Sequence, residues 1–519
     1  MYDYIPKASR QTLLILLTIA IVIIVIAAIN FTNFSASLTP MRIKSINTQK
    51  VLGARQGALR FALMFEAVFI SFLSFLVALL LVSLFKGTSL ARLVNGDLSI
   101  AAHPLIAGGS VLVACITGFF AGMFPARYMT SFAPSLVLKG SFGLSPKGRK
   151  LRNTLICIQY IASFALIIGA SFMYLQNYFM QNSALGYDKE ALITVNINQI
   201  RKSRDAFTHQ IQALSEVKDV TYSEFLLSSS DAYMKWGRQY KGKNIMFQVL
   251  PVQHTFLKVM GIEISQGRDF REEDANLEDG VYLFNESARQ QYNLELNTLF
   301  VDGAKIIGFV PDIKFASFRV AVEPMAFYVP GTQDTYYQNN LNIASIRLNK
   351  GANLHSAVSH IRSTLAAFDA NYTFEVRFFD EILQRAYEKE TALSLLITLF
   401  SLIAIFISMV GVFGLVIFDS ESRRKEIGVR KVHGSSTSGI IIMFNKVYLK
   451  IILICFAGSV PLAWYAIHRW LEQFAYKTPM YGWVYLLAFV AVAMITIGTV
   501  TFQNWRVAND NPVNSIKSE

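Results

Sequence analysis

The chain has 519 residues, of which 53% are hydrophobic and 16% are charged. Ordinary soluble domains carry about 25% charged residues, so this composition excludes a wholly soluble protein and indicates a membrane protein with a soluble part. The net charge is +13, but residues 181–390 hold 22 basic and 26 acidic residues, a balance of −4 that leaves +17 for the rest. Such a distribution argues against a nucleic-acid footprint.

Seven apolar runs are long enough to cross a bilayer, which takes about 20 residues. The first is interpreted as a retained helix, because it is too long for the apolar core of a secretory signal and no small-residue cleavage site follows it. We predict a membrane α-helical fold with about seven transmembrane helices and one α+β extracytoplasmic domain of two subdomains between helices 4 and 5. The runs lie near 12–34, 61–85, 104–126, 154–177, 393–418, 439–467 and 483–503.

The loops between these runs predict the orientation of the chain. Segments 35–60 and 127–153 contain five and six basic residues and no acidic ones, and segment 419–446 contains six basic residues. Cytoplasmic loops carry an excess of Lys and Arg. We therefore expect these segments and the C-terminus to be cytoplasmic, and residues 178–392 to be extracytoplasmic.

Within the first unit, Glu66 lies about one turn into its helix, and we expect it to pair with a nearby arginine. We expect no charged residue at the centre of the membrane, which argues against an ion-driven carrier. The three cysteines all lie in apolar runs, so we predict neither a disulfide nor a thiolate metal site in the soluble region. They are Cys115, Cys157 and Cys455.

The soluble region predicts two βαβ-like halves. Residues 191–197 indicate a strand and 203–218 a helix capped by Ser203; 345–349, 354–368 and 373–379 indicate strand, helix and strand. Residues about 240–335 indicate an inserted β-rich lobe.

No metal or catalytic site is predicted in this region. The acidic stretch 271–279 lacks calcium-loop spacing and is interpreted as a solvated loop. His355 and His360 are five positions apart, so they do not share a helical face for metal binding. No nucleophile, base and acid assemble, and no glycine-rich loop ends in Gly-Lys-[Ser/Thr]. We expect neither catalysis nor a cofactor, and an energy source on a separate polypeptide.

A repeat connects the two ends of the chain. "MRIKSINTQKVLG" (41–53) matches "SRRKEIGVRKVHG" (422–434) without a gap, 381 positions apart, with six identities. A Pro-x3-[Leu/Ile]-Lys pattern follows twice, at Pro134 and Pro512. We infer one three-helix unit present twice, in 1–153 and 393–519, with helix 154–177 and domain 178–392 between them. Internal symmetry of this kind is common in transporters.

The later basic segment predicts a short helix over 420–433. Arg423, Ile427 and Arg430–Lys431 recur at helical spacing and share a face. Gly434 is suited to end the helix, and Glu426 is placed to pair with Arg430 one turn later. A topogenic basic loop lying on anionic lipid is the alternative.

Together these features resemble FtsX-like/MacB-type permeases, the membrane subunits of a class of bacterial ABC systems. Domain phrases such as "KVMGIEISQGRDF" (258–270), "IIGFVPDIKFASF" (306–318) and "FDEILQRAYEKE" (379–390) support the resemblance, as does the terminal Asn-Pro-Val-x-x-Ile-Lys. It implies a bacterial inner-membrane location and a MacB-like extracytoplasmic domain. It also implies a coupling helix at 420–433 that docks a cytoplasmic ABC ATPase.

The resemblance assigns the ATPase contact to the second basic segment, with a weaker contact at the degenerate segment 36–57. It also leads us to expect that the first unit lacks an opening helix and a domain, so that the chain pairs with a second permease chain, a copy or a longer homologue. A membrane sensor or scaffold without transport, and a truncated remnant, are the other interpretations. The main contact residues would be Arg423, Arg424, Lys425, Glu426, Ile427, Gly428, Arg430, Lys431 and Gly434, and the weaker ones Arg42, Lys44, Ile46, Lys50 and Gly53.

Overall fold

The computed structural model divides into two units. It describes residues 10–86, 88, 99, 102–132, 146–228, 234–300, 303–314, 318–422 and 424–509. The first unit contains residues 1–177, 391–470 and 479–519, and the second contains 178–390 together with 471–478. The second unit is therefore built from two separate parts of the chain.

The first unit is helical. Seven of its described helices are long and apolar enough to cross a membrane, which confirms the predicted fold class. Their apolar spans are Leu13–Ala36, Gln56–Phe85, Pro104–Met129, Asn153–Asn182, Thr391–Gly414, Thr437–Leu471 and Gly482–Trp505. The helices that contain them are α1 (Arg10–Ser37), α3 (Gln56–Phe85), α4 (Pro104–Met129), α6 (Pro146–Asn182), α12 (Phe379–Ser422), α14 (Thr437–Leu471) and α15 (Gly482–Ala508).

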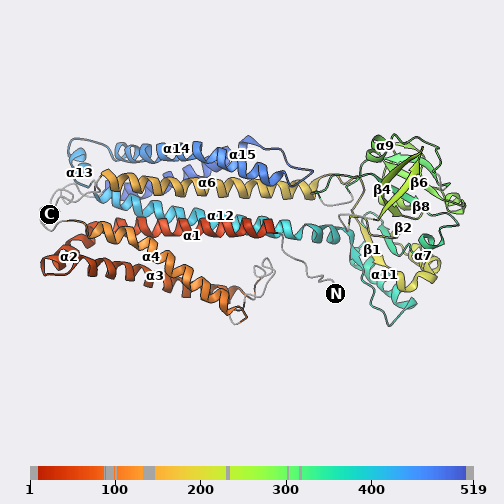
Figure 1. The fold of residues 1–519 in the computed structure, drawn as a ribbon, viewed down its shortest axis with the longest axis horizontal. Helices are drawn as coiled ribbons and strands as arrows, with labels where there is room; N and C mark the ends of the chain where they lie inside the picture. The colour runs from red at the N-terminus through yellow and green to blue at the C-terminus, as the bar shows by residue number, and fades with distance from the viewer. Residues whose placement is uncertain are drawn as a thin grey trace. The chain divides into compact units, whose positions relative to one another are not determined.

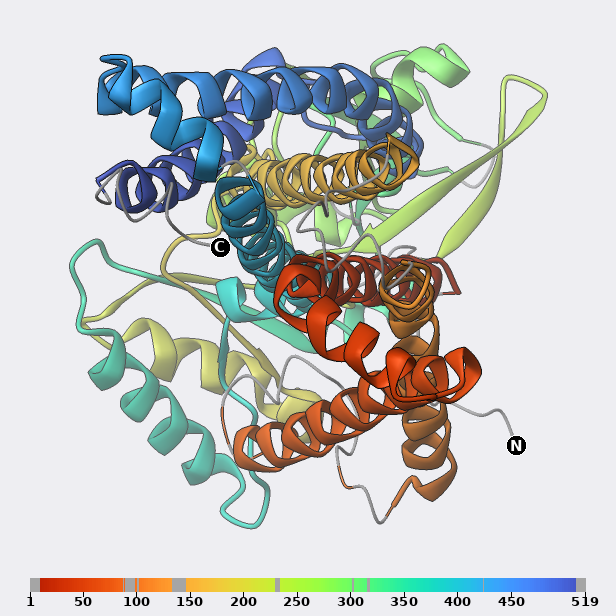
Figure 2. The ribbon, with the colours of Figure 1, turned by 90° about the vertical axis from the view of Figure 1, so that its left-hand side faces the viewer.

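Two short helices, α2 (Thr39–Val51) and α13 (Arg424–Val432), follow α1 and α12. Both lie at the same end of the helical unit, at the left in Figure 1 and toward the viewer in Figure 2. The order of long helix, short helix and two long helices occurs twice, as the repeat predicts. Three of the long helices, α1, α6 and α12, share one apolar core, made of Ile19, Ile26, Leu166, Ala170, Met173, Leu393, Ile397 and Ala404.

The second unit contains two sheets. The four-stranded sheet is antiparallel, in the order β10-β1-β9-β2. Helices α7 (Arg204–Gln212) and α11 (Leu354–Phe368) pack on it, because Phe207, Ile211 and Ile361 are buried in its core. Its strands are β1 (Leu192–Asn196), β2 (Val217–Ser223), β9 (Ile343–Leu348) and β10 (Arg377–Phe378).

The six-stranded sheet is inserted between β2 and β9 and has the order β3-β4-β8-β6-β7-β5. Aromatic residues dominate its core, in which Phe247 contacts the rings of both Tyr282 and Phe284. Its strands are β3 (Lys235–Tyr240), β4 (Lys243–Pro251), β5 (Gln266–Gly267), β6 (Val281–Asn285), β7 (Lys305–Val310) and β8 (Met325–Val329). The short helices of this unit are η2 (Asn198–Ser203), α8 (Phe256–Met260), η3 (Glu272–Asn276), α9 (Glu286–Tyr292) and α10 (Thr335–Asn339).

Several local predictions are corrected. The helix expected over 203–218 ends at Gln212, since residues 217–223 form β2, and Ser203 makes no side-chain cap. The strand expected over 373–379 shrinks to two residues, because α12 begins at Phe379. The acidic stretch 271–279 is not merely solvated, because Asp274 is buried and its carboxylate accepts from Arg268 at 2.6 and 2.7 Å.

Candidate functional site

The second basic segment forms a short, firmly terminated helix. α13 spans Arg424–Val432, so the predicted start at residue 420 is too early, since α12 continues to Ser422. Gly434 has φ +87°, and the Ser435 N–H donates to the Arg430 carbonyl at 2.9 Å. This left-handed glycine confirms the predicted helix end, because a residue with a Cβ adopts such a φ at a cost.

The first basic segment ends in the same way. α2 spans Thr39–Val51, Gly53 has φ +98°, and the Ala54 N–H donates to the Gln49 carbonyl at 2.9 Å. Gly53 and Gly434 are 381 positions apart, as are Gln49 and Arg430. The repeat recognised in the sequence is therefore also a repeat of backbone conformation and hydrogen bonding.

The faces of α13 differ in exposure. Val429 and Val432 are 50% and 65% exposed, and Arg430, also exposed, pairs with Glu426 at 2.9 Å. This i,i+4 pair was predicted and is confirmed. Ile427, by contrast, is only 3% exposed.

The predicted contact set changes accordingly. Ile427 and Gly428 are buried inside the chain, so neither offers an accessible contact, and they are corrected to packing positions. Lys431 is half-buried. Arg423 lies outside the described residues, and for Arg424 and Lys425 the structure describes the helical backbone only.

The cations of α2 are engaged within the chain. Arg42 forms a two-pronged ion pair with Glu66, at 3.0 and 2.8 Å, which confirms the arginine partner expected for Glu66. The Lys50 ammonium donates to the carbonyls of Thr130 and Phe132 at 2.6 and 2.9 Å. Burial and the neighbouring Arg60 cation lower the pKa of Lys50. Arg42 and Lys50 therefore hold α2 against α3 and the end of α4.

The other weaker-contact residues divide between the two sides of α2. Ile46 is 7% exposed and packs with Leu59 and Met129, whereas Lys44 is exposed. Val51 and Leu52, at the end of the helix, are 66% and 81% exposed.

Thr130, which the sequence did not single out, is the centre of this attachment. Its carbonyl accepts from Lys50 and from the Gln56 amide, and its hydroxyl accepts from the Arg60 guanidinium at 2.9 Å. The side chain is fully buried. A threonine one residue past a helix end has no distinctive local pattern, so only the fold reveals that three cationic or amide side chains converge on it.

A second arrangement lies in the other unit, around Lys314. Its ammonium lies 4.7 Å from the ring centre of Phe318, 5.2 Å from Tyr476 and 5.9 Å from Phe179. The Tyr476 N–H donates to the Phe318 carbonyl at 3.2 Å, and the Val322 N–H donates to the Tyr476 hydroxyl at 3.3 Å. Burial lowers the pKa of Lys314. We call Lys314, Phe318, Val322 and Tyr476 the loop clasp.

The loop clasp holds the segment that joins α14 to α15. Phe474 of this segment is 3% exposed and carries the Arg319 guanidinium 4.5 Å above its ring. Residues 471–478 thus belong to the second unit by their contacts, although they join two helices of the first. Sequence reasoning did not find these contacts, because nothing local connects residue 476 to residue 318.

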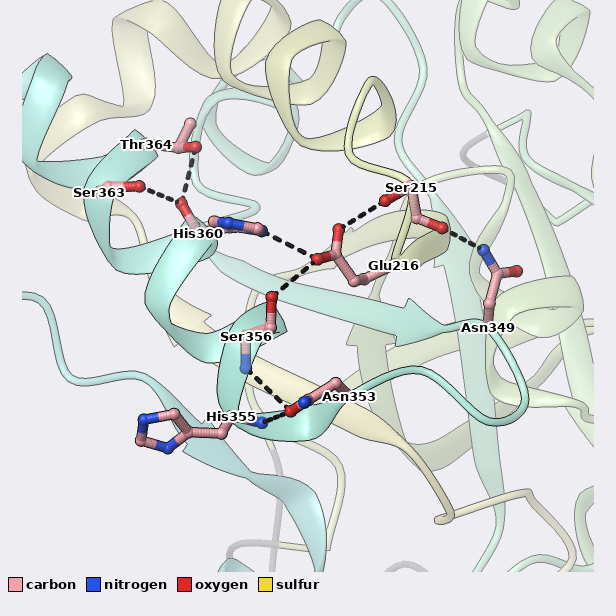
Figure 3. A network of polar contacts seen from close by, with 9 residues as sticks. All are labelled: Ser215, Glu216, Asn349, Asn353, His355, Ser356, His360, Ser363 and Thr364. Carbon is pink, nitrogen blue, oxygen red and sulfur yellow. Dashed lines mark hydrogen bonds and ion pairs between the residues drawn. The ribbon is translucent and has the colours of Figure 1, made fainter.

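A polar network surrounds Glu216 and His360 in the second unit. Glu216 accepts from the Ser215 and Ser356 hydroxyls at 3.0 Å, and His360 Nδ1 lies 2.9 Å from it (Figure 3). The Glu216 backbone N–H, followed by the two hydroxyls, holds the pKa of this carboxyl below its ordinary value. Because Ser356 donates to Glu216 and not to the imidazole, the group lacks a nucleophile–base pair.

His355 points away from this network (Figure 3), so it does not join His360, in agreement with the spacing argument. Among the described residues, no group of three or more His, Cys, Asp or Glu side chains is placed to hold a metal. The exposed ion pair and exposed valines of α13 make this basic helix the candidate functional site.

Two family models match separate parts of the chain. The model described as FtsX-like permease C-terminal matches residues 17–134 and again 398–512. The model described as MacB-like periplasmic core domain matches residues 161–364. The first model thus matches both copies of the repeat, and each match includes one of the two basic segments.

Curated relatives are exporters with both ATP-binding and permease parts in their names. The macrolide export ATP-binding/permease protein MacB of Chromobacterium violaceum is 23% identical over 236 residues, covering 43% of this chain and 35% of that protein. The probable syringafactin export ATP-binding/permease protein SyfD of Pseudomonas syringae is 21% identical, covering 43% and 34%. The chain therefore spans about a third of the length of the curated relatives it matches.

Two solved structures with low similarity are domains of transport proteins. The periplasmic region of MacB from Actinobacillus actinomycetemcomitans is 16% identical, with a TM-score of 0.29, covering 38% of this chain and 94% of that one. The extracellular domain of the ABC-type transporter YknZ from Gram-positive bacteria is 10% identical, with a TM-score of 0.26, covering 33% and 88%.

Proposed function

The chain belongs to the FtsX-like/MacB-type family of ABC transporter permeases, and from this premise we propose that it couples a separate cytoplasmic ATPase to movements of its extracytoplasmic domain. The ATPase docks on α13 and moves it during the ATP cycle. The domain formed by residues 178–392 then handles cargo or controls a partner outside the bacterial inner membrane, by efflux, lipoprotein release or regulation of an envelope enzyme.

The single observation that carries this proposal is the difference between the two basic helices. In α2, Arg42 and Lys50 are engaged by Glu66 and by backbone carbonyls. In α13, Arg430 pairs with Glu426 of the same helix and is itself exposed, and Val429 and Val432 are exposed beside it. Apolar side chains next to cations on a rigid short helix suit a protein surface with an acidic rim.

Continuity of the chain supplies a route for the movement. α12 is one helix of 44 residues, Phe379–Ser422, and a single residue separates it from α13. A displacement of α13 therefore acts directly on the end of the long helix α12. The loop clasp supports a second route, because residues 471–478 continue directly from α14 and lead into α15.

The test is co-purification of the full chain from its native membranes. With a tag on the chain, we expect an ABC ATPase with a Gly-Lys-[Ser/Thr] phosphate loop to be retained. Arg430→Glu with Lys431→Glu should reduce retention at least tenfold, about 1.4 kcal/mol of binding free energy. Lys44→Glu on α2 is the matched control, exposed and basic but in the weaker segment, and should reduce retention less.

Each other interpretation predicts a different result. Binding to anionic vesicles that is lost with the double reversal, without any ATPase, indicates a topogenic loop on lipid. ATPase retention without cargo movement indicates a sensor or scaffold. No bound ATPase with the unaltered chain indicates a remnant.

We also propose pairing with a second permease chain, a copy or a longer homologue. α12 exposes an apolar stripe that is suited to another helix in the bilayer. A single cysteine near Leu402, which is 57% exposed, should give interchain cross-links in membranes that contain the ATPase. Absence of such cross-links would remove this part of the proposal. The stripe consists of Leu402, Phe406, Val410 and Phe413.

A further inference from the structure

Helices α1 and α12 meet at equivalent positions of the two repeats. The offset of 381 residues pairs Asn30 with Gly411 and Ile26 with Ile407. The Asn30 Nδ2 donates to the Ile407 carbonyl at 2.9 Å, and a Cβ built on Gly411 would lie 2.7 Å from Asn30 Oδ1. The Asn30 side chain of the first repeat thus packs against the backbone of Gly411, which is its counterpart in the second repeat.

A third helix brings a second amide to the same point. Gln159 of α6 is 2% exposed, and its Nε2 lies 3.1 Å from the same Cβ position on Gly411. Neither polar atom of Gln159 has a hydrogen-bond partner among the described residues, and neither has Asn30 Oδ1. Unsatisfied polar groups in a bilayer cost several kcal/mol each, so this arrangement favours any small movement that pairs them.

The two amides are complementary and close. Asn30 Oδ1 and Gln159 Nε2 can be no more than about 5.8 Å apart, the sum of their distances to the common point. Because the Asn30 amide nitrogen already donates to the Ile407 carbonyl, its oxygen is left to accept from the Gln159 amide nitrogen. One turn further along, the Ser163 and Ser408 hydroxyls already bond α6 to α12 at 2.8 Å.

We propose that Asn30, Gln159 and Gly411 form an inter-repeat polar junction. In it, the Gln159 amide bonds to Asn30 when α6 shifts against α1, while Asn30 keeps its bond to the Ile407 carbonyl. Gly411 is required because any side chain there would occupy the space where the two amides approach. Asn30 and Gln159 are positioning residues that hold the repeats together and have no part in binding cargo.

The junction goes beyond the proposed function, since it concerns how the two halves are joined whatever they transport. Its place in the chain is nevertheless significant. Asn30 lies nine residues before the start of α2, and Gly411 lies 13 residues before the start of α13. A shift of either short helix is therefore delivered first to the helices that form the junction.

The first test is of geometry. In a chain with Cys115, Cys157 and Cys455 replaced by Ala, the pair Asn30→Cys and Gly411→Cys should form an intrachain disulfide on mild oxidation in membranes. A cysteine sulfur at residue 30 would take the place of the Asn30 Cγ, which lies 3.2 Å from the Gly411 Cβ position, so a sulfur on that Cβ can reach it. The control pair is Asn30→Cys with Gly458→Cys, on α14. If the first pair forms no disulfide, Asn30 of α1 does not contact Gly411 of α12 and the proposal is overturned.

The second test is of the hydrogen bond, by thermal unfolding of the full chain in one detergent. Asn30→Leu and Gln159→Leu should each lower the midpoint, and the double variant should fall no further than the worse single variant. The exchanged pair, Asn30→Gln with Gln159→Asn, should lie closer to the unaltered chain. Additive shifts, or an exchanged pair as low as the double leucine variant, would overturn the proposal.

Glycine replacement supplies an independent readout. Gly411→Ala should lower the midpoint because the methyl group meets both amides. Gly458→Ala, where nothing lies within 4 Å, should leave it unchanged or raise it, as alanine favours helix over glycine. An unchanged midpoint for Gly411→Ala would show that the amides do not converge there.

Discussion

The loop clasp should hold residues 471–478 by a free energy that a single substitution reveals. Tyr476→Ala removes one of the rings around the Lys314 ammonium, the acceptor of the Val322 N–H, and the ring contact with Phe318. A cation–π contact contributes about 0.5–1 kcal/mol near a surface and a hydrogen bond about 1 kcal/mol. Because Tyr476 is only half-buried, we expect a loss of about 2 kcal/mol.

The assay is hydrogen–deuterium exchange of the full chain in a lipid nanodisc. The Tyr476 amide donates to the Phe318 carbonyl, so its exchange reports opening of the loop clasp. A loss of about 2 kcal/mol predicts exchange about 30-fold faster across this segment. Lys314→Met should give a smaller increase, since removing the charge also removes the cost of burying it.

Tyr336→Ala is the matched control, because this tyrosine of the same unit is 65% exposed and lies outside the loop clasp. It should leave exchange in residues 471–478 unchanged. Equal exchange in the Tyr476→Ala and unaltered chains would refute the reasoning that these contacts hold the loop.

Three further predictions follow from the second unit. Arg347→Met should lower the unfolding midpoint of the second unit by more than 5 °C. Arg347 donates to the Val259 carbonyl at 3.0 and 2.8 Å, and such charged hydrogen bonds contribute about 1.5–3 kcal/mol each. Arg362→Met, at an exposed position, should leave the midpoint unchanged. Burial raises the pKa of Glu224 to about 7 from an ordinary 4.5, so the free energy of unfolding should fall as pH rises between these values. Glu224→Gln should therefore unfold at a higher temperature than the unaltered chain at pH 8, but not at pH 4. An impermeant amine reagent should label exposed Lys243 in intact spheroplasts and spare Lys44; the reverse would invert the topology.

The sequence predicted those features that have a local physical signal. Apolar runs predicted the seven spans, and the glycine after the second basic segment predicted the helix end at Gly434. The Glu426–Arg430 pair followed from a spacing of four residues. Helix α11 was predicted with its observed bounds, Leu354–Phe368, since its apolar residues recur at helical spacing.

Features that depend on packing between distant segments were not predicted. Helical spacing put Ile427 and Arg430 on one face, but only the fold shows that Ile427 turns inward. The length of strand β10 was overestimated because the apolar residues of 373–379 suit a strand. The observed strand ends at Phe378, since α12 begins at Phe379. The loop clasp and the contact of Asn30 with α12 join residues more than 150 positions apart, for which no periodicity gives a sign.

Photo-cross-linking from α13 tests the central claim most directly. A photoreactive phenylalanine analogue at Val432, which is 65% exposed, should capture an ABC ATPase in native membranes, identified by mass spectrometry. The same analogue at Tyr336 in the second unit should capture none. If Val432 cross-links only to lipid, or if the ATPase is captured from Tyr336 instead, α13 is not the docking helix and the proposed coupling is contradicted.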